Sequence, residues 1–259
     1  MGQVWIHAEL GYSYRAMRIA LPRALLVLLV LSLSRASFAQ APPTLTADDR
    51  TAIQALVTGY AQALGGCRAE EFADLFAPGT GSFASGIRGQ VVGREHLIAL
   101  VQSERHCTAP SGATPAPRPG GGAGPTVAIE VTSTGVRGVA TLGAAGEYQD
   151  EYVKTPKGWR FLSRTVLIPA EKAAGLDANE MLAIRKLAGT GVQLGDYYVA
   201  DQSGVKRFMT AGVAINVAAG AVTGHAYLKD GGYYDDVYEK IAPGQWRIKS
   251  RTRVASAAP

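Results

Sequence analysis

The sequence predicts an α+β protein. Apolar residues recur at helical spacing in three segments between residues 46 and 103, and from residue 127 onward the chain consists of short strand-like segments separated by turns. In addition, residues 127–154 align without a gap to residues 213–240. Helices followed by a run of strands are typical of an α+β fold, and the repeat indicates that part of this architecture occurs twice.

The composition is that of a globular protein rather than a fibrous, disordered or disulfide-dense one. Of 259 residues, 47% are hydrophobic and 2 are cysteines. The formal net charge is +5, but the first 39 residues hold four arginines and one glutamate, so the remaining chain carries 22 basic against 20 acidic residues. This near balance argues against a basic-patch nucleic-acid binder, and we expect no nucleic-acid partner.

The first 39 residues have the pattern of a secretory signal peptide. Residues 17–39 combine a basic start, an apolar run at Ala24–Leu33, and small residues before Ala39, after which we expect cleavage. Residues 1–16 are either a mis-assigned upstream extension or a long n-region. Because the apolar run is shorter than the about 20 residues that a spanning helix needs, we expect a periplasmic or secreted protein with no membrane span after processing.

Three helices are expected before the long strands. The first begins with the capping-box-like pair Thr46 and Asp49 and ends at a Gly-Gly pair. The second ends at Pro78-Gly79, and the third follows Gly93. Their apolar stripes consist of Ile53, Leu56, Val57, Tyr60, Ala61 and Leu64 in the first helix, Phe72, Leu75 and Phe76 in the second, and Leu97, Leu100 and Val101 in the third.

Six strands are expected between residues 82 and 168, some between the helices and the others after them. A tight turn at residues 155–158, with proline at its second position, joins the last two strands. Residues 108–126 hold five Pro and five Gly in 19 positions, which predicts a loop with no fixed secondary structure. The expected strands are 82–85, 89–92, 127–132, 136–142, 147–154 and 159–168.

The repeat extends beyond the ungapped block. Residues 183–187 echo residues 52–56 of the first helix, but counterparts of the second and third helices are missing. We therefore expect a truncated internal repeat of one helix plus about five strands. Matched pairs include Tyr148/Tyr234, Asp150/Asp236, Tyr152/Tyr238 and Lys154/Lys240 and, after one extra residue, Trp159/Trp246, Arg160/Arg247, Ser163/Ser250, Arg164/Arg251 and Thr165/Thr252.

The turn at residues 155–158 predicts which side chains share a face of the hairpin. The two copies agree on the tyrosine and aspartate face and differ at the alternate positions, so we interpret the first face as packed and the other as solvated. We place Arg160, Arg164, Arg247 and Arg251 on the solvated face. With Lys154 opposite Trp159, the expected cross-strand pairs are Tyr152–Phe161, Asp150–Ser163 and Tyr148–Thr165.

Four phrases of the sequence resemble a SnoaL-like domain of the nuclear transport factor two-like superfamily over about residues 46–168. The resemblance implies a cone-shaped curved mixed or antiparallel sheet that wraps around helices and leaves a pocket. We expect this cone domain at 46–170 and the truncated second copy at 171–259, packed on the first as an intrachain pseudo-dimer. The phrases are TADDRTAIQALVTGYAQAL, AEEFADLFAP, VVGREHLIALV and GEYQDEYVKTPKGWRFLSRTV.

The chain departs from this family at two places. Relatives commonly carry an acidic residue just after helix one, where this chain has Gly65-Gly66-Cys67. Arg105-His106 is followed by Cys107 and the Pro- and Gly-rich loop rather than by the next strand. The family includes cyclases, dehydratases, isomerases and members without known activity, but the paired histidines of its dehydratases are not evident here.

The candidate catalytic residues are Asp150, His106 and Tyr60. A carboxylate buried against aromatic rings has a raised pKa and can abstract a proton, while a tyrosine hydroxyl stabilises the resulting oxyanion. Against this, Asp236 repeats Asp150 in a copy that lacks the enclosing helices, which favours a structural role for both. Tyr60 then belongs to the core, and His106 caps a helix. The expected ligand-pocket residues are Tyr148, Tyr152, Trp159 and Phe161.

The two cysteines allow two interpretations. Cys67 and Cys107 either form a disulfide, which export would favour, or remain separate buried thiols. Two cysteines so far apart, with no histidine pair at helical offset, do not form a zinc motif, and we expect no metal and no cofactor.

Three functional hypotheses follow. The first is an exported pocket protein of unassigned role that binds a small apolar or aromatic molecule. The second is a cofactor-independent lyase, isomerase or cyclase that uses an acid-base pair in that pocket. The third is a non-catalytic interaction module in which the second copy provides a surface for a homodimer.

Overall fold

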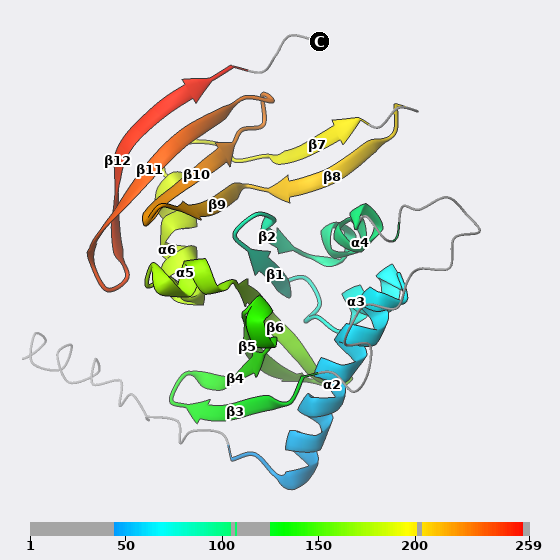
Figure 1. The fold of residues 1–259 in the computed structure, drawn as a ribbon. Helices are drawn as coiled ribbons and strands as arrows, with labels where there is room; N and C mark the ends of the chain where they lie inside the picture. Colours follow the sequence, from blue (N-terminus) through cyan, green and yellow to red (C-terminus); the bar gives the residue numbers. More distant parts are fainter. Residues whose placement is uncertain (1–43, 105–106, 108–124, 201–203, 256–259) are drawn as a thin grey trace, which may run out of the picture. The chain divides into compact units, whose positions relative to one another are not determined.

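A computed structural model describes residues 44–104, 107, 125–200 and 204–255 (Figure 1). The chain divides into two compact units, residues 1–40 and 41–259. The expected signal peptide lies outside the described residues, and so do His106 and residues 108–124 of the Pro- and Gly-rich segment.

The predicted α+β fold is confirmed. Helix α2 begins at the predicted capping box, in which Thr46 and Asp49 bond to each other's backbone N–H groups, and it ends at Gly65. The first half of the unit contains α2 (Ala47–Gly65), α3 (Ala69–Asp74), β1 (Ser82–Ser85), β2 (Gly89–Val92), α4 (Arg94–Ser103), β3 (Val127–Thr132), β4 (Gly135–Thr141), the 3-10 turn η1 (Gly143–Ala145), β5 (Glu147–Thr155) and β6 (Gly158–Leu167).

The second half contains two helices and six strands rather than one helix and about five strands. Its short first helix is built on a proline, which suits the first turn of a helix because its missing N–H has no intrahelical role there. The elements are α5 (Pro169–Ala173), α6 (Ala178–Ala188), β7 (Asp196–Ala200), β8 (Lys206–Ala211), β9 (Val213–Ala218), β10 (Ala221–Tyr227), β11 (Tyr233–Ala242) and β12 (Gln245–Val254).

The strands form two sheets. The larger has eight strands in the order β3-β4-β5-β6-β1-β2-β8-β7, and it is mixed because β1 runs parallel to β6 and β2 parallel to β8. The smaller has four strands in the order β12-β11-β10-β9. Strands β7 and β8 therefore extend the first sheet instead of the second.

Strands β9 to β12 repeat the arrangement of β3 to β6. β9 and β10 begin and end 86 residues after β3 and β4, and β12 begins and ends 87 residues after β6. The order of the four strands is also the same in the two sheets. That residues 171–259 are a truncated second copy of the domain remains a prediction, since it rests on this internal comparison alone.

A β-bulge changes the register expected for the β5–β6 hairpin. Lys154 pairs with Trp159 and Tyr152 with Phe161, as predicted, but Leu162 is then passed over. Asp150 consequently lies opposite Arg164, and Tyr148 lies opposite Val166. The predicted pairs Asp150–Ser163 and Tyr148–Thr165 were wrong because simple alternation does not anticipate an extra residue in one strand.

The bulge also moves an arginine from one face to the other. We call the sheet face with Tyr148, Asp150 and Tyr152 the inner face, and the opposite one the outer face. Arg164, which was predicted on the solvated face, lies on the inner face and is fully buried. The second hairpin has the same irregularity between Val237 and Tyr238, which places Arg251 opposite Asp236.

Helices cover the inner face. Tyr60 of α2 packs its ring against Phe72 of α3 and against Tyr148 and Phe161 of the sheet. A second core lies around α6 and includes Leu167 from the end of β6 together with residues of β9, β10 and β11. The two halves therefore share buried apolar surface.

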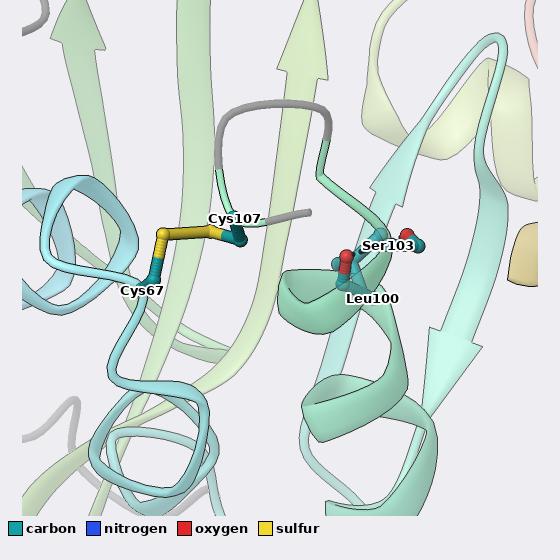
Figure 2. The surroundings of a disulfide bond; sticks show 4 residues. All are labelled: Cys67, Leu100, Ser103 and Cys107. Atoms are coloured by element: carbon teal, nitrogen blue, oxygen red, sulfur yellow. Dashed lines mark hydrogen bonds between the residues drawn. A yellow bond between two sulfur atoms is a disulfide. The ribbon is translucent and has the colours of Figure 1, made fainter. Parts of the chain in front are cut away.

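A disulfide between Cys67 and Cys107 ties the end of α2 to the segment that follows α4 (Figure 2). The Cα atoms are 5.4 Å apart, and 40 residues separate the two cysteines. Of the two interpretations left open by the sequence, the structure has the bridge rather than two free thiols. In the chain-entropy picture, closing a loop of this length removes conformational freedom from the unfolded chain.

Reduction of this disulfide should lower the free energy of unfolding by about 3 to 4 kcal/mol, because the unfolded chain regains the freedom that the loop removed. Urea unfolding with and without dithiothreitol measures the difference. The double variant Cys67→Ser/Cys107→Ser should unfold like the reduced protein and should not respond to dithiothreitol. A wild-type unfolding curve that is insensitive to the reductant would contradict the prediction.

Candidate functional site

A buried ion pair lies at the centre of the inner face. The Arg164 guanidinium donates from Nε to Asp150 Oδ1 and from Nη2 to Asp150 Oδ2, at 2.8 Å each. Tyr152 donates its hydroxyl to Asp150 Oδ2 at 2.7 Å. Both members of the ion pair have fully buried side chains. The two hydrogen bonds from Arg164 and the one from Tyr152 satisfy the Asp150 carboxylate with partners from the inner face alone.

Three aromatic rings surround the Arg164 guanidinium. Its central carbon lies 4.2 Å from the ring centre of Tyr60, 4.1 Å from that of Tyr148 and 4.3 Å from that of Phe161. Such contacts stabilise a cation that has lost its water. Burial works to lower the pKa of Arg164, but the adjacent Asp150 carboxylate outweighs it and raises the pKa above its usual value.

A glycine makes room for this arrangement. A Cβ atom at Gly138 would lie 2.8 Å from the Tyr152 hydroxyl, so any larger residue would push Tyr152 away from Asp150. Gly224 holds the matching position beside Tyr238, where a Cβ would lie 3.0 Å from a ring carbon of that tyrosine. These two glycines are a matched pair of the sequence repeat.

The second sheet contains the same group of residues. Arg251 donates from Nε and Nη2 to the two oxygens of Asp236 at 2.7 Å each, and Tyr238 donates to the same carboxylate at 2.9 Å. The Arg251 guanidinium stacks on one tyrosine ring, that of Tyr234. The Arg251 side chain is 22% exposed, whereas that of Arg164 is fully buried.

Each copy also anchors its hairpin to the first turn of its helix. Asp49 of α2 accepts hydrogen bonds from Trp159 Nε1 and Lys154 Nζ, both at 2.8 Å. These donors hold the pKa of the Asp49 carboxyl well below its usual range. In the second half of the unit, Glu180 of α6 accepts in the same way from Trp246 and Lys240. Trp159 is therefore a structural anchor.

A pocket of about 310 Å³ opens between α2 and the inner face, and we call it the cone pocket. Tyr60 and Tyr148, both predicted as site residues, line it. Tyr152, Trp159 and Phe161, predicted as pocket residues, do not border it, because they pack in the buried core. Its other lining residues are Leu64, Phe83, Ser85, Gly86, Ile87, Arg88, Glu104, Val166, Ile168 and Glu171.

The structure does not bring Asp150 and Tyr60, two of the three predicted catalytic residues, into one pocket. Asp150 is absent from the lining of the cone pocket, and Arg164 and Tyr152 already occupy its carboxylate. Burial raises the pKa of the Tyr60 hydroxyl well above its usual value, so this group is a hydrogen-bond donor rather than a base at neutral pH. His106 lies outside the described residues. The ion pair with Arg164 agrees with a structural role for Asp150, and the catalytic role stays a prediction.

In the parts of the chain that the structure describes, no group of three or more His, Cys, Asp or Glu residues is arranged to hold a metal ion. Among the helices of these parts, none is both long and apolar enough to cross a bilayer.

The arginine of the ion pair was missed by sequence reasoning. A signal was available, because Ser163-Arg164-Thr165 and Ser250-Arg251-Thr252 are matched in the repeat and an arginine kept in both copies needs a partner in both. Asp150 and Asp236 are matched in the same way. Because the bulge shifts the register, simple alternation does not pair Asp150 with Arg164 or Asp236 with Arg251.

Comparison with known proteins finds a family match in the first half of the unit. Residues 45–165 match the protein family described as the SnoaL-like domain. No curated protein matches the chain.

Several solved structures are similar to about half of the chain. A Mycobacterium tuberculosis protein of unknown function is 21% identical, with 50% of this chain and 77% of that chain covered and a TM-score of 0.33. An NTF2-like protein with a cystatin-like fold from Novosphingobium aromaticivorans is 21% identical, with 49% and 88% covered and a TM-score of 0.34. A Nostoc punctiforme domain of unknown function with a cystatin-like fold is 16% identical, with 55% and 96% covered and a TM-score of 0.34.

The substitution Asp150→Asn should destabilise the protein by about 3 to 5 kcal/mol, because it leaves the Arg164 guanidinium buried without a counter-charge. The matched substitution Asp236→Asn should cost less, since Arg251 is partly exposed and also donates to the carbonyl of Ala188. Urea unfolding of the two variants measures the difference. If the two variants lose equal free energy of unfolding, or if Asp236→Asn loses more, then burial of the Asp150–Arg164 pair does not determine the size of the loss.

Proposed function

We propose that residues 45–165, which match the SnoaL-like domain family, bind a small apolar or aromatic molecule in the cone pocket. Domains of this kind serve ligand-binding or isomerase-type roles in general. The observation that carries the proposal is an apolar pocket whose walls are held rigid by the buried Asp150–Arg164 pair.

The size and lining of the cone pocket support a small ligand. Its volume of about 310 Å³ is at the lower end of the range of ligand pockets in proteins. Leu64, Phe83 and Val166 provide aliphatic and aromatic contact surface, and Tyr148 adds a ring at the wall. Because the rings of Tyr60 and Tyr148 pack against the Arg164 guanidinium, these two walls are fixed before a ligand arrives.

Polar groups gather at one side of the pocket. Arg88 forms an ion pair with Glu104 at 3.5 Å and donates from Nη1 to the carbonyl of Met209 at 2.9 Å. Glu171 lines the pocket with a pKa raised by burial. A ligand with an apolar body and one polar end fits this distribution, with the body against the rings and the polar end near these groups.

Binding is favoured over acid-base catalysis because the pocket lacks the expected base. The Asp150 carboxylate is used by Arg164 and Tyr152, and Tyr60 holds its proton. The Tyr60 hydroxyl is also engaged, by a hydrogen bond with Tyr148. Among the described residues, the pair of Asp150 and Tyr60 that the isomerase hypothesis names is therefore not assembled in the cone pocket.

We also propose that the protein is exported to the periplasm or secreted. The signal-peptide pattern that ends at Ala39 is one basis for this. The disulfide between Cys67 and Cys107 is a second and independent one, since such bridges persist in oxidising compartments.

The wild-type protein should bind 2-naphthol, a small aromatic probe with one polar end, and Val166→Trp should abolish the binding. Val166 lines the cone pocket, and an indole in its place fills the void. Isothermal titration calorimetry measures the affinity.

The matched control is Val199→Trp, on the exposed face of β7, which should bind the probe like the wild type. Circular dichroism of both variants confirms that they are folded. If the wild type does not bind 2-naphthol, or if Val166→Trp binds it equally well, the cone pocket is not the binding site and the interaction-module hypothesis gains support.

Expression of the full chain in a bacterium should yield a periplasmic or secreted product whose mass corresponds to a start at Gln40, since cleavage is expected after Ala39. Cell fractionation and intact-mass spectrometry give the result. A full-length product that stays in the cytoplasm would contradict the proposal of export.

A further inference from the structure

A second hollow lies on the outer face of the first sheet. Its volume is about 400 Å³, and we call it the outer groove. Strands β4, β5, β6 and β1 provide its floor, and α6 from the second half of the unit provides a wall through Asp177, Leu182 and Arg185. It is thus a separate site from the cone pocket, which lies on the inner face.

The floor of the outer groove is polar. Hydroxyl groups come from Ser82, Ser163 and Thr165, and an amide group from Gln90. The amide of Gln149, also in the lining, is bound to Glu147 and to the backbone of Ala178. Ser82 pairs with Ser163 across β1 and β6, so these two hydroxyl-bearing residues share the outer face. A floor with this many donors and acceptors suits a hydroxylated molecule and not the apolar ligand of the cone pocket.

The notable residue of the groove is Arg185, one turn before the end of α6. Its side chain is only 7% exposed, and Nη2 donates to the carbonyl of Ser85 at 2.9 Å. Its Nε has no hydrogen-bond partner among the described residues. Three buried side-chain atoms of the described residues have no partner, Arg164 Nη1, Arg185 Nε and Thr210 Oγ1, and of these residues only Arg185 lines the outer groove.

The charge of Arg185 is also only partly balanced. Burial lowers its pKa to about 10, and the field of Glu171 offsets this only in part. Arg185 therefore remains a cation at neutral pH. It also lines an adjoining hollow of about 200 Å³ that shares Gln90 and Leu182 with the outer groove.

Two other charged residues of the lining are already engaged, because Asp150 binds Arg164 and Asp177 caps the start of α6. The rest lie on β3, β4 and β5. Arg137 donates to Glu151 at 3.2 Å, and Ser163 donates to the second oxygen of the same carboxylate at 3.3 Å. Glu130 on β3 adds an acceptor there. Strand β3 is the fourth strand from β1 in the sheet, so this acidic end is well separated from Arg185.

We propose that the outer groove binds a small hydroxylated carboxylate, such as a sugar acid, with its carboxylate on Arg185. The guanidinium Nε supplies the unpaired donor and the charge, and the Ser and Thr hydroxyls of the floor bond to the ligand's hydroxyl groups. Glu130 and Glu151 accept from hydroxyls at the far end. This site requires α6 and gives the second half of the unit a part in ligand recognition.

The test uses two sugars that differ in the proposed recognition group, D-glucuronate and D-glucose. Titration calorimetry of the wild-type protein should show binding of glucuronate at least about tenfold tighter than that of glucose, because only glucuronate presents a carboxylate to Arg185. Arg185→Lys, which keeps a charge but lacks the Nε donor, should weaken glucuronate binding by about tenfold.

A second pair of variants keeps the test decisive if Arg185→Lys does not fold. Thr165→Val removes one hydroxyl from the floor and should weaken glucuronate binding without changing that of 2-naphthol. Thr210→Val is the matched control, because Thr210 on β8 is equally buried and is not part of the groove lining. The proposal is overturned if glucuronate binds no better than glucose, or if Thr165→Val binds it like the control.

Discussion

The buried pair of Asp150 and Arg164 is the constraint from which the inner face follows. Two charges that are buried away from water need several partners at fixed positions. A bulge, a glycine and three aromatic rings provide these positions. The bulge at Leu162 turns Arg164 inward, and the absence of a side chain at Gly138 leaves room for the Tyr152 hydroxyl. The rings of Tyr60, Tyr148 and Phe161 then enclose the cation, and two of these rings become walls of the cone pocket.

Each half of the unit contains an aspartate–arginine ion pair, but the groups around the arginine differ between the two halves. In the second sheet, α6 ends at Ala188, and Arg251 donates to the carbonyl of that last residue. In the first sheet, α2 continues to Gly65, and aromatic rings surround Arg164 instead. Helix length thus decides whether the arginine caps a helix or is enclosed by rings. The longer helix α2 also provides Tyr60 and Leu64 to the wall of the cone pocket on the inner face.

The sequence predicted those features that depend on local periodicity. The bounds of α2, β1, β2 and β3 follow from caps, glycines and alternation, and the structure has them within about one residue. The pairing of Asp150 was not predictable from alternation, because Leu162 is passed over without any composition signal of a bulge. The sequence also did not show which sheet β7 and β8 join, because they lie outside the repeated block and pair with the first sheet through long-range contacts.

The same three residues of β6 serve both faces of the sheet. Arg164 points inward to support the cone pocket, while Ser163 and Thr165 on either side point outward to the floor of the outer groove. The bulge therefore sets the chemistry of two sites at once, with the charge buried on one face and the hydroxyls presented on the other. By itself the outer face would be an ordinary solvated surface, and it becomes a groove because α6 from the second half lies across it.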